Sequence, residues 1–503
     1  MYDILLCSIP FSNLESIYSA PAILKGIVQA EGYTAKTKDF GTVLLNLCNK
    51  DEEVFHQIQN YFISPSRTLT NQQMLVVHKL YDYVVEYIRK NPTRFLGFSV
   101  FSIYTHKATY ELCQRIKQQL PNQRIVLGGR GCQMTTYSSV CEDLSVTGID
   151  KTTLFGSLLI QRGLADDLVL GDGEDAILEL LEKDQLTNVV YSTDTFSYPI
   201  PNYDDYDFDD YLFDKDKVSL PITGSKGCVR DCDFCNVKAQ FGKYRYRSGK
   251  DIADEMISIS KKLGYRKFQF TDSLVNGGLK PFREFCTVLA EYNDQNPNQK
   301  ITWNGQYICR PAEHVPDDIY PLMARAGAHG LTIGAESGSN NVLRAINKKT
   351  TVEELYSELE QFQKHGITCS LLTMTGHWSE THEDFLDHCR MFFKILPYVR
   401  SGTISSVGVG LPMFFLDDTP AMNNAANNHI IFSDFDQANI WYKKDSDQIT
   451  YKQKVYRWGT VVKLCQKLRI PIQAHVGNLS VITGYINANY KKINEFYESV
   501  VYN

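Results

Sequence analysis

Two runs of alternating strand-like and helix-like segments constrain the fold of this 503-residue chain more than any other feature. The first run has a short apolar strand at Ile4–Cys7, a helix that can open at Pro21, and buried strands at Phe95–Phe101 and Arg124–Leu127. Parallel strands joined by helical crossovers produce such an alternation. We therefore predict a doubly wound, Rossmann-like α/β sheet over residues 1–195, which binds ligands beyond the carboxyl ends of its strands.

The second run extends over residues 219–415 and contains six strand–helix units. A helix at Asp251–Leu263 places its apolar residues on one face and ends at a glycine. After the first strand of this run, strands are predicted at Lys267–Phe270, Ile301–Trp303, Leu331–Gly334, Ile367–Met374 and Thr403–Val407. Right-handed crossovers can curl six parallel strands into a partial (β/α)6 TIM-like barrel, with its active site at the carboxyl-terminal mouth.

Two further segments complete the predicted domain organisation. Residues 196–218 carry many acidic and aromatic residues, and we interpret them as a linker whose charges are solvated and whose rings pack on the domains. Residues 416–503 contain a helical pattern around Trp441 and Trp458 and no metal or phosphate motif. We expect them to form a helical C-terminal domain.

The composition limits the partners and the location of the protein. The net charge of −6 gives no general attraction to nucleic acid. No apolar run approaches 18 residues, and the first residues lack the basic region of a signal peptide, so no membrane span or secretion signal is expected. Ten of the thirteen cysteines show no pairing pattern, which favours a reducing, cytoplasmic compartment.

The other three cysteines form the most specific motif of the chain. Cys228, Cys232 and Cys235 have the spacing Cys-x3-Cys-x2-Cys, which can place three thiolates around one iron–sulfur cube and leave its fourth iron without a protein ligand. A structural zinc site is the alternative interpretation. Such a site needs a closed set of four ligands, usually two Cys-x2-Cys pairs, and the chain has no second pair.

Segments after the later strands strengthen the cluster interpretation. Phe270-Thr-Asp272-Ser273 follows the second strand, Trp303-Asn-Gly-Gln306 the third, and Gly334-Ala-Glu336-Ser337-Gly-Ser the fourth, ahead of Asn347-Lys348. In this order the motifs resemble the radical S-adenosylmethionine (SAM) superfamily. The resemblance implies that Cys228, Cys232 and Cys235 hold a 4Fe–4S cluster whose open iron is chelated by SAM. It also implies a set of SAM-binding residues: Phe234, Asp272, Ser273, Gln306, Glu336, Ser337 and Lys348.

The order of motifs in the first run resembles the cobalamin-binding domain that precedes the radical domain in one large subfamily. A helix that begins Pro-Ala-x-Leu and ends in Glu-Gly follows the first strand, and later strands end in Gly-Gly and before Gly-x-Gly-Glu. The resemblance assigns six residues to cobalamin: Ser99, Gly128, Gly129, Gly171, Gly173 and Glu174. Each glycine motif alone could simply form a tight turn. A nicotinamide or flavin site is poorly supported, because no Gly-x-Gly-x-x-Gly follows the first strand.

Two departures from the cobalamin pattern bear on the metal. No His lies between Met1 and Phe55, so the Asp-x-His-x-x-Gly motif that ligates cobalt from below is missing. The usual Gly-Gly-x-His is replaced by Gly128-Gly129-Arg130-Gly131. If cobalamin binds, we expect no motif-derived histidine beneath it.

The resemblance implies a cobalamin-dependent radical SAM enzyme, with a probable role as a C-methyltransferase. In that reaction a 5′-deoxyadenosyl radical activates an unreactive carbon, and an electron donor such as flavodoxin or ferredoxin supplies the electron. A non-methylating radical enzyme, a cyclase or a rearrangement catalyst, remains open, with or without cobalamin. A methylthiotransferase or a non-catalytic binding protein fits the motifs less well. The substrate cannot be read from the sequence; His377 and Trp378, in a departure from the family's Gly-x-Pro-Gly-Glu-Thr, are candidates to face it.

Overall fold

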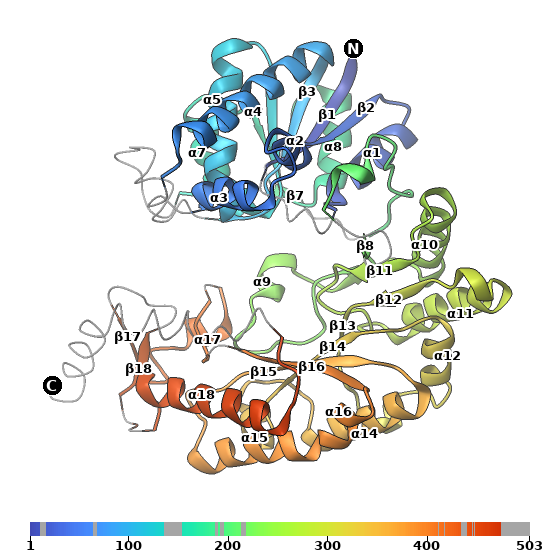
Figure 1. Ribbon diagram of the computed structural model, residues 1–503, viewed down its shortest axis with the longest axis vertical. Helices are drawn as coiled ribbons and strands as arrows, with labels where there is room; N and C mark the ends of the chain where they lie inside the picture. The colour runs from blue at the N-terminus through green and yellow to red at the C-terminus, as the bar shows by residue number, and fades with distance from the viewer. Residues whose placement is uncertain are drawn as a thin grey trace. The chain divides into compact units, whose positions relative to one another are not determined.

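The computed structural model divides into two compact units, Met1–Pro221 and Ile222–Asn503 (Figure 1). It describes residues 1–10, 17–63, 68–134, 153–186, 190–191, 196–212, 218–410, 412–416, 418–433, 440–444, 446 and 448–473. Residues 213–217 of the predicted linker and residues 474–503 of the predicted C-terminal domain lie outside the described residues. Each unit is considered by itself below.

The first unit is built on a five-stranded parallel sheet. Its strands are β1 (Tyr2–Ser8), β2 (Ala35–Asp39), β3 (Thr93–Ser99), β4 (Arg124–Gly128) and β5 (Asp167–Leu168), in the order β2-β1-β3-β4-β5. Its helices are α1 (Ala20–Ala30), α2 (Phe40–Leu47), α3 (Glu52–Ile63), α4 (Asn71–Lys90), α5 (His106–Gln119), α7 (Phe155–Gln161) and α8 (Gly173–Lys183). Helices cover the sheet (Figure 1), and the central strands are apolar and buried because both of their faces are covered. The predicted doubly wound sheet is confirmed.

The strand register aligns the carboxyl ends of neighbouring strands, which form a level edge of the sheet. Ser8 pairs with Asp39 on one side and with Ser99 on the other, and Ser99 pairs with Gly128. The carboxyl ends of the four strands β2, β1, β3 and β4 therefore lie side by side. The strand order reverses between β1 and β3, and ligands of doubly wound sheets bind in the crevice at such a switch point.

The acidic segment over residues 203–212 packs onto the first unit. Asp205 accepts hydrogen bonds from Lys25 Nζ at 2.6 Å and from the backbone nitrogen of Thr37 at 2.8 Å. The Tyr211 hydroxyl donates to Asp39 Oδ2 at 2.9 Å, and the Tyr211 ring is buried. The rings therefore anchor the segment, as expected, but Asp205 is partnered rather than solvated.

The barrel strands of the second unit occupy six positions in chain order, one of which is shared by two short strands. They are β8 (Leu220–Ile222), β11 (Lys267–Phe270), β12 (Thr302–Asn304) with β13 (Gln306–Tyr307), β14 (Leu331–Glu336), β15 (Cys369–Thr373) and β16 (Ile404–Val409). The pairing orders are β12-β11-β8 and β13-β14-β15-β16. Between β12 and β13, Gly305 leaves no room for a side chain, because a Cβ there would lie 2.5 Å from Val275. The predicted partial barrel is confirmed.

Helices follow the barrel strands (Figure 1), and most of them bury apolar residues. They are α10 (Gly249–Leu263), α11 (Leu279–Gln295), α12 (Ile319–Arg325), α13 (Asn340–Ala345), α14 (Val352–His365), α15 (His382–Lys394) and α16 (Leu396–Arg400). Along β14, Leu331, Ile333 and Ala335 are buried while the residues between them are only half-buried. Trp303 of β12 fills the adjoining core, edge-on to the rings of Phe270 and Phe285.

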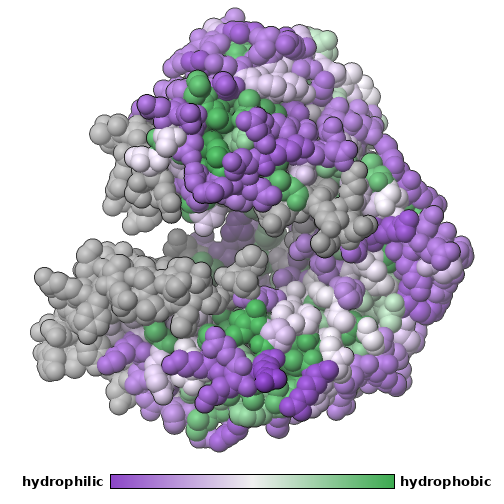
Figure 2. Space-filling model, in the orientation of Figure 1, coloured by the Kyte–Doolittle hydropathy of each residue, from purple (hydrophilic) through white to green (hydrophobic). Residues whose placement is uncertain are grey.

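The C-terminal part of the second unit combines helices with a strand pair. Helix α17 (Pro420–Asn423) precedes the antiparallel strands β17 (Ile430–Phe432) and β18 (Trp441–Lys443), and α18 (Tyr451–Leu468) follows. The strand pair was not predicted, although Ile-Ile-Phe and Trp-Tyr are residue types that favour strands. Among the helices described, none is long and apolar enough to cross a bilayer, and hydrophilic side chains cover much of the visible surface of each unit (Figure 2).

Candidate active site

The three motif cysteines lie on one loop that follows the first barrel strand. A short strand, β9 (Ser225–Lys226), pairs antiparallel with β10 (Arg245–Tyr246), and the loop between them carries the cysteines and α9 (Val237–Phe241). The backbone nitrogen of Cys235 donates to the carbonyl of Cys232 at 3.1 Å, and that of Arg230 donates to Cys228 Sγ at 3.3 Å. Cys232 is buried, and Cys228 and Cys235 are half-buried.

The surroundings of these thiols disfavour free thiolates. Burial raises the pKa of Cys232 to about 12, against the opposing charge of Lys348, while Glu336 and the two other cysteines reinforce the rise. Burial also raises the pKa of Cys235. Because metals bind thiolates and not thiols, a cationic centre must displace these protons and hold the sulfurs ionised.

A single metal ion and a four-iron cluster make different demands on the three thiols. In the part of the chain that the structure describes, no three Cys, His, Asp or Glu side chains are placed to hold one metal ion. Zinc would draw its thiolates to about 2.3 Å from one centre, whereas a four-iron cube spreads three thiolates over three different iron atoms. The donor set and its spacing therefore fit a cluster better than the alternative zinc site.

Hydrogen bonds fasten the cysteine loop to the segment that carries Lys348. The backbone nitrogen of Asp233 donates to the carbonyl of Ile346 at 3.1 Å, and Asn347 Nδ2 donates to the carbonyl of Asp231 at 2.7 Å. Phe234, between two of the cysteines, packs against the apolar cluster that includes Leu343 and Ile346. These contacts place the predicted SAM-binding residues Phe234 and Lys348 beside the cysteines.

Glu336 and Lys348 form an ion pair at the end of β14. Lys348 Nζ lies 2.7 Å from Glu336 Oε1, and each side chain is only 12% exposed. Glu336 has a φ of +56°, a conformation that costs a non-glycine residue free energy and that is concentrated at functional sites. A Cβ at Gly334 would crowd Glu336 Oε1 and Lys348 Nζ, so a larger residue there would displace the ends of these two side chains.

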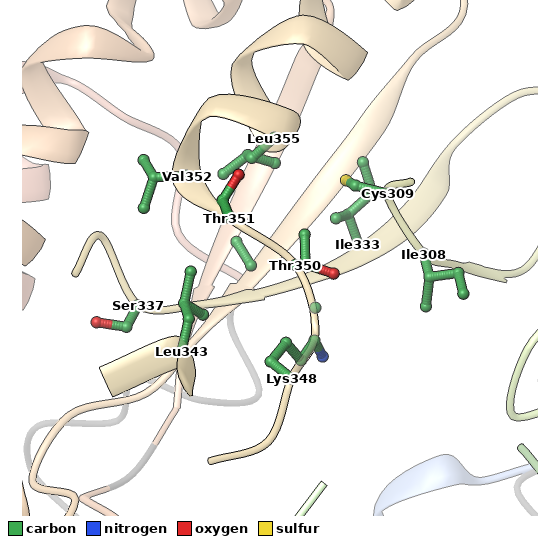
Figure 3. A pocket seen from close by; sticks show the side chains of 12 residues that line it. Ile308, Cys309, Ile333, Ser337, Leu343, Lys348, Thr350, Thr351, Val352 and Leu355 are labelled. Atoms are coloured by element: carbon green, nitrogen blue, oxygen red, sulfur yellow. The ribbon is translucent and has the colours of Figure 1, made fainter. Parts of the chain in front are cut away.

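A small pocket adjoins this ion pair (Figure 3). Ser337, Leu343 and Lys348 line it on one side, and Ile308 and Cys309 lie on the other. Glu336 and Lys348, two of the residues that the resemblance assigns to SAM, thus contact each other directly. A ligand bound here would replace this internal pair with contacts of its own.

The turn after β14 is fastened by α15. The backbone nitrogen of Gly338 donates to His388 Nδ1 at 3.0 Å, and Ser339 Oγ donates to Asp384 Oδ1 at 2.6 Å. His388 is fully buried, and burial lowers its pKa to about 4, so the imidazole is neutral and can accept this bond. Sequence reasoning missed both α15 residues, which belong to no motif.

The remaining predicted SAM residues follow the neighbouring strands β11 and β12. Asp272 is buried and accepts a hydrogen bond from the backbone nitrogen of Gly224 at 2.8 Å; burial raises its pKa to about 7, although its hydrogen bonds oppose that rise. Ser273 is half-buried, and Gln306 is exposed at the start of β13. All three therefore lie at the end of the barrel that carries the cysteine loop.

The two predicted substrate residues have partners within the protein. His377 is buried; its Nε2 lies 3.2 Å from Asp233 Oδ2, and its Nδ1 lies 2.7 Å from Ser379 Oγ. Trp378 stacks on Phe415 with ring centroids 5.7 Å apart. These contacts make His377 a tether of the cysteine loop, and its contact with substrate stays a prediction.

A buried ion pair that sequence reasoning missed joins this region to the C-terminal segment. Arg457 of α18 lies 2.8 Å from Glu380 Oε1, and the backbone nitrogen of Gly376 donates to Glu380 Oε2 at 2.9 Å. Glu380 belongs to the motif recognised in the sequence, but its partner lies 77 residues later. No local pattern could have revealed it.

In the first unit, the predicted cobalamin residues gather at the level edge of the sheet. Ser99 and Gly128 end adjacent strands, and Gly173 and Glu174 begin α8 just after Gly171. Gly129 has a φ of +98°, and a Cβ there would lie 2.6 Å from the carbonyl oxygen of Val100. The turn thus brings bare backbone to the edge, as close approach of a ligand requires.

The loop after β3 adds exposed apolar groups to this edge. Phe101, Ile103 and Tyr104 are 56%, 45% and 46% exposed. His106, in contrast, is buried: its Nε2 lies 2.8 Å from the carbonyl oxygen of Gly131, and its ring stacks on Phe155. A large, flat and partly apolar ligand fits such a surface, and the nearest histidine already has its partners.

The chain is similar to known proteins in sequence and in fold. Residues 222–392 match the model of the radical SAM superfamily. The anaerobic magnesium-protoporphyrin IX monomethyl ester cyclase of Synechocystis sp. is 23% identical over 308 residues, which span 57% of this chain and 56% of that protein. The chain thus spans little more than half the length of this curated relative.

Two solved structures share the fold over most of the chain. The radical SAM methyltransferase TsrM from Kitasatospora setae, with cobalamin and a [4Fe-4S] cluster bound, has a TM-score of 0.61 at 14% identity and covers 93% of this chain and 89% of its own. The cobalamin-dependent SAM radical enzyme OxsB, with aqua-cobalamin and SAM bound, has a TM-score of 0.63 at 13% identity and covers 99% and 71%. At these identities the likeness establishes the fold.

Proposed function

We propose that this chain is a cobalamin-dependent radical SAM enzyme that methylates an unactivated carbon of its substrate; residues 222–392 match the radical SAM model, and the chain shares the fold of TsrM and OxsB. The observation that carries the proposal is the juxtaposition of three cysteines on one loop with the Glu336–Lys348 pair. Sulfur donors for a cluster and paired charges for a zwitterionic ligand meet at one end of the barrel.

The chain's own residues would hold and orient the reactants. Cys228, Cys232 and Cys235 bind the cluster, which with SAM supplies a 5′-deoxyadenosyl radical when both are present. Glu336 accepts hydrogen bonds from the ribose hydroxyls, and Lys348 pairs with the carboxylate. Burial of these groups excludes water and so strengthens their electrostatic contacts with a ligand.

The level edge of the first sheet supports cobalamin as the second cofactor. Gly129 exposes backbone, and Phe101, Ile103 and Tyr104 offer apolar contacts at the switch point. Cobalamin would carry the methyl group, which a second SAM would donate as it becomes S-adenosylhomocysteine. With His106 buried among its own partners, we expect no protein nitrogen beneath the cobalt.

A second candidate is a radical SAM enzyme that closes a ring without methylation. The sequence relationship to a cyclase favours it. The two candidates share the cysteine loop and the SAM residues and differ only in the fate of the methyl group of SAM.

Product analysis distinguishes these candidates without knowledge of the substrate. The full chain is reconstituted anaerobically with iron and sulfide, supplied with cobalamin and SAM, and reduced chemically or by flavodoxin or ferredoxin. A methylating enzyme should form both 5′-deoxyadenosine and S-adenosylhomocysteine. Formation of 5′-deoxyadenosine alone would favour the cyclase-like alternative, and formation of neither would contradict both.

A further inference from the structure

A lysine without a polar partner is buried in the C-terminal part of the second unit. Lys454, in the first turns of α18, has no exposed surface. Within the described residues, its Nζ has no hydrogen-bond partner and no carboxylate in ion-pair range. The nitrogen lies 3.3 Å from the ring centroid of Trp441 in β18. An amine in this position is taken out of water with only the aromatic rings of Trp441 and Tyr451 as compensation.

Two other buried donors near this lysine also lack partners in the part of the chain described. Trp458 lies one turn further along the same face of α18, and its Nε1 is unpartnered. Thr375 Oγ1 is likewise unpartnered, and the next residue, Gly376, packs so closely on Lys454 that a Cβ there would lie 2.9 Å from Lys454 Cγ. A lysine ammonium and a tryptophan indole can only donate, and a threonine hydroxyl can donate as well.

The side chains of Lys454, Trp458 and Thr375 include no anionic acceptor. Burial lowers the pKa of Lys454 well below its ordinary value, so the amine stays neutral without a partner. Buried donors are almost always paired, and each exception needs an explanation. An anion beside the amine would accept a hydrogen bond from Lys454 and would stabilise its ammonium form.

The donors lie beside the candidate active site. Thr375 and Gly376 follow β15 at the barrel mouth, and His377 bonds Asp233 in the cysteine loop. The wall around Trp441 is apolar and includes Phe234, Met374, Trp378, Phe415 and Phe432. A ligand here would meet one potential cation and many apolar side chains.

We propose that Lys454, with Thr375 and Trp458, binds the carboxylate of an organic-acid substrate whose body is apolar or aromatic. One lysine and two neutral donors match a monoanion better than a doubly charged phosphate, because they supply a single positive charge. That this organic acid is the substrate rests on the function proposed above. Binding of a carboxylate by Lys454 does not depend on that function.

Benzoate is a suitable probe because it combines an aromatic body with one carboxylate. Thermal unfolding of the full chain and isothermal titration would be measured with benzoate, and with inorganic phosphate at the same ionic strength. We expect benzoate to bind the wild type and raise its Tm, and phosphate to do so at least tenfold more weakly. Equal or tighter binding of phosphate would overturn the choice of carboxylate.

Substitutions then assign the binding to the lysine. Lys454→Met should raise the Tm of the ligand-free protein, because it removes an uncompensated amine, and should weaken benzoate binding at least tenfold. Lys463→Met, on the exposed side of the same helix, should leave both properties unchanged. Trp458→Phe is a milder change that should weaken benzoate binding about threefold and that serves if Lys454→Met fails to fold.

Two results would overturn the proposal: no benzoate binding to the wild type, or binding that Lys454→Met and Trp458→Phe leave intact. Neither result affects the proposed radical SAM function. That function is tested by iron, sulfide and 5′-deoxyadenosine, none of which requires Lys454.

Discussion

The two units present ligand edges of opposite character. In the first unit the edge is shaped by backbone and apolar side chains, with Gly129 in a turn that admits no Cβ and Phe101 exposed beside it. In the second unit the barrel mouth carries ionisable side chains, the cysteines and the Glu336–Lys348 pair. A site formed by backbone and apolar side chains can be recognised in the sequence only by the order of its strands and helices. A site formed by reactive side chains can be recognised by a motif.

At both edges a buried histidine holds a loop, but the two histidines play opposite hydrogen-bonding roles. Each loop is held by a buried histidine whose pKa is lowered to about 4 by burial. His106 bonds a carbonyl oxygen of the glycine turn, so its nitrogen must donate. His388 bonds a backbone N–H, so its nitrogen must accept, and protonation would destroy that bond. Acid should therefore release the barrel loop more readily than the glycine turn.

The largest expected effect is the loss of the cluster. Replacement of Cys228, Cys232 and Cys235 by Ala should abolish iron and sulfide binding and 5′-deoxyadenosine formation, and should leave cobalamin binding by the first unit intact. Iron and sulfide analysis after anaerobic reconstitution measures this. Cys389→Ala is the control, since this half-buried thiol lies outside the loop. Tightly bound zinc in the wild type would contradict the prediction.

The next largest effect is expected from acid, which should break the hydrogen bond that His388 accepts but not the one that His106 donates. The folded pKa of His388, about 4, lies below the unfolded value of 6.5, so its stabilising contribution is complete above pH 6.5 and is lost as the pH falls toward 4. His388→Asn keeps an acceptor for Gly338 and cannot titrate. Between pH 7.5 and 4.5, the wild type should lose up to about 3 kcal/mol more unfolding free energy than this variant.

Urea unfolding at a series of pH values measures the difference, and the comparison with His388→Asn cancels the carboxylates that both proteins share. Parallel pH dependence in the two proteins would show that His388 does not titrate in this range. In that case acid would not distinguish the barrel loop from the glycine turn.

A charge change at the barrel mouth should act on SAM and not on cobalamin. Glu336→Ala should weaken SAM binding by about 1–3 kcal/mol, because charge-assisted hydrogen bonds to the ribose are lost. Equilibrium dialysis with the reconstituted protein measures this. Glu360→Ala, an exposed carboxylate on α14, is the matched control. Unchanged affinity in Glu336→Ala would remove Glu336 from the SAM site.

An added methyl group at the glycine turn of the first unit should weaken cobalamin binding. Gly129→Ala places a methyl group against the Val100 carbonyl and should weaken cobalamin binding about tenfold, or about 1.4 kcal/mol, without loss of iron. Gly163→Ala also adds a methyl group at positive φ, but with nothing within 4 Å, and should bind cobalamin normally. Titration with hydroxocobalamin measures both. Similar losses in the two variants would indicate general strain instead of a ligand edge.

The contrast between the edges also explains what the sequence revealed. Alternating strands and helices were sufficient to predict both sheets, because covered parallel strands are continuously apolar. The cysteine loop and Glu336 were found because their chemistry needs particular residue types in a fixed order. His388, Asp384 and Arg457 were missed, since they reach the site from other elements and any buried polar residue could occur there for structural reasons.

The strand pair β17–β18 shows another limit. Its two short strands lie in a segment where helical periodicity was also visible, and each strand is stable only through its partner and the apolar cluster around Trp441. Lys454 carried no signal either, because a single lysine near the start of a helix normally faces solvent. Only tertiary structure shows that this one is enclosed.

The ion pair between Glu336 and Lys348 has a consequence for how binding responds to salt. The pair carries no net charge, and a ligand whose carboxylate takes over Lys348 replaces one ion pair with another, while Glu336 turns to the neutral ribose hydroxyls. Screening by dissolved salt would then weaken the pair that breaks as much as the pair that forms. Affinity for such a ligand should vary little with ionic strength, in contrast to sites that attract their ligands with an unbalanced charge.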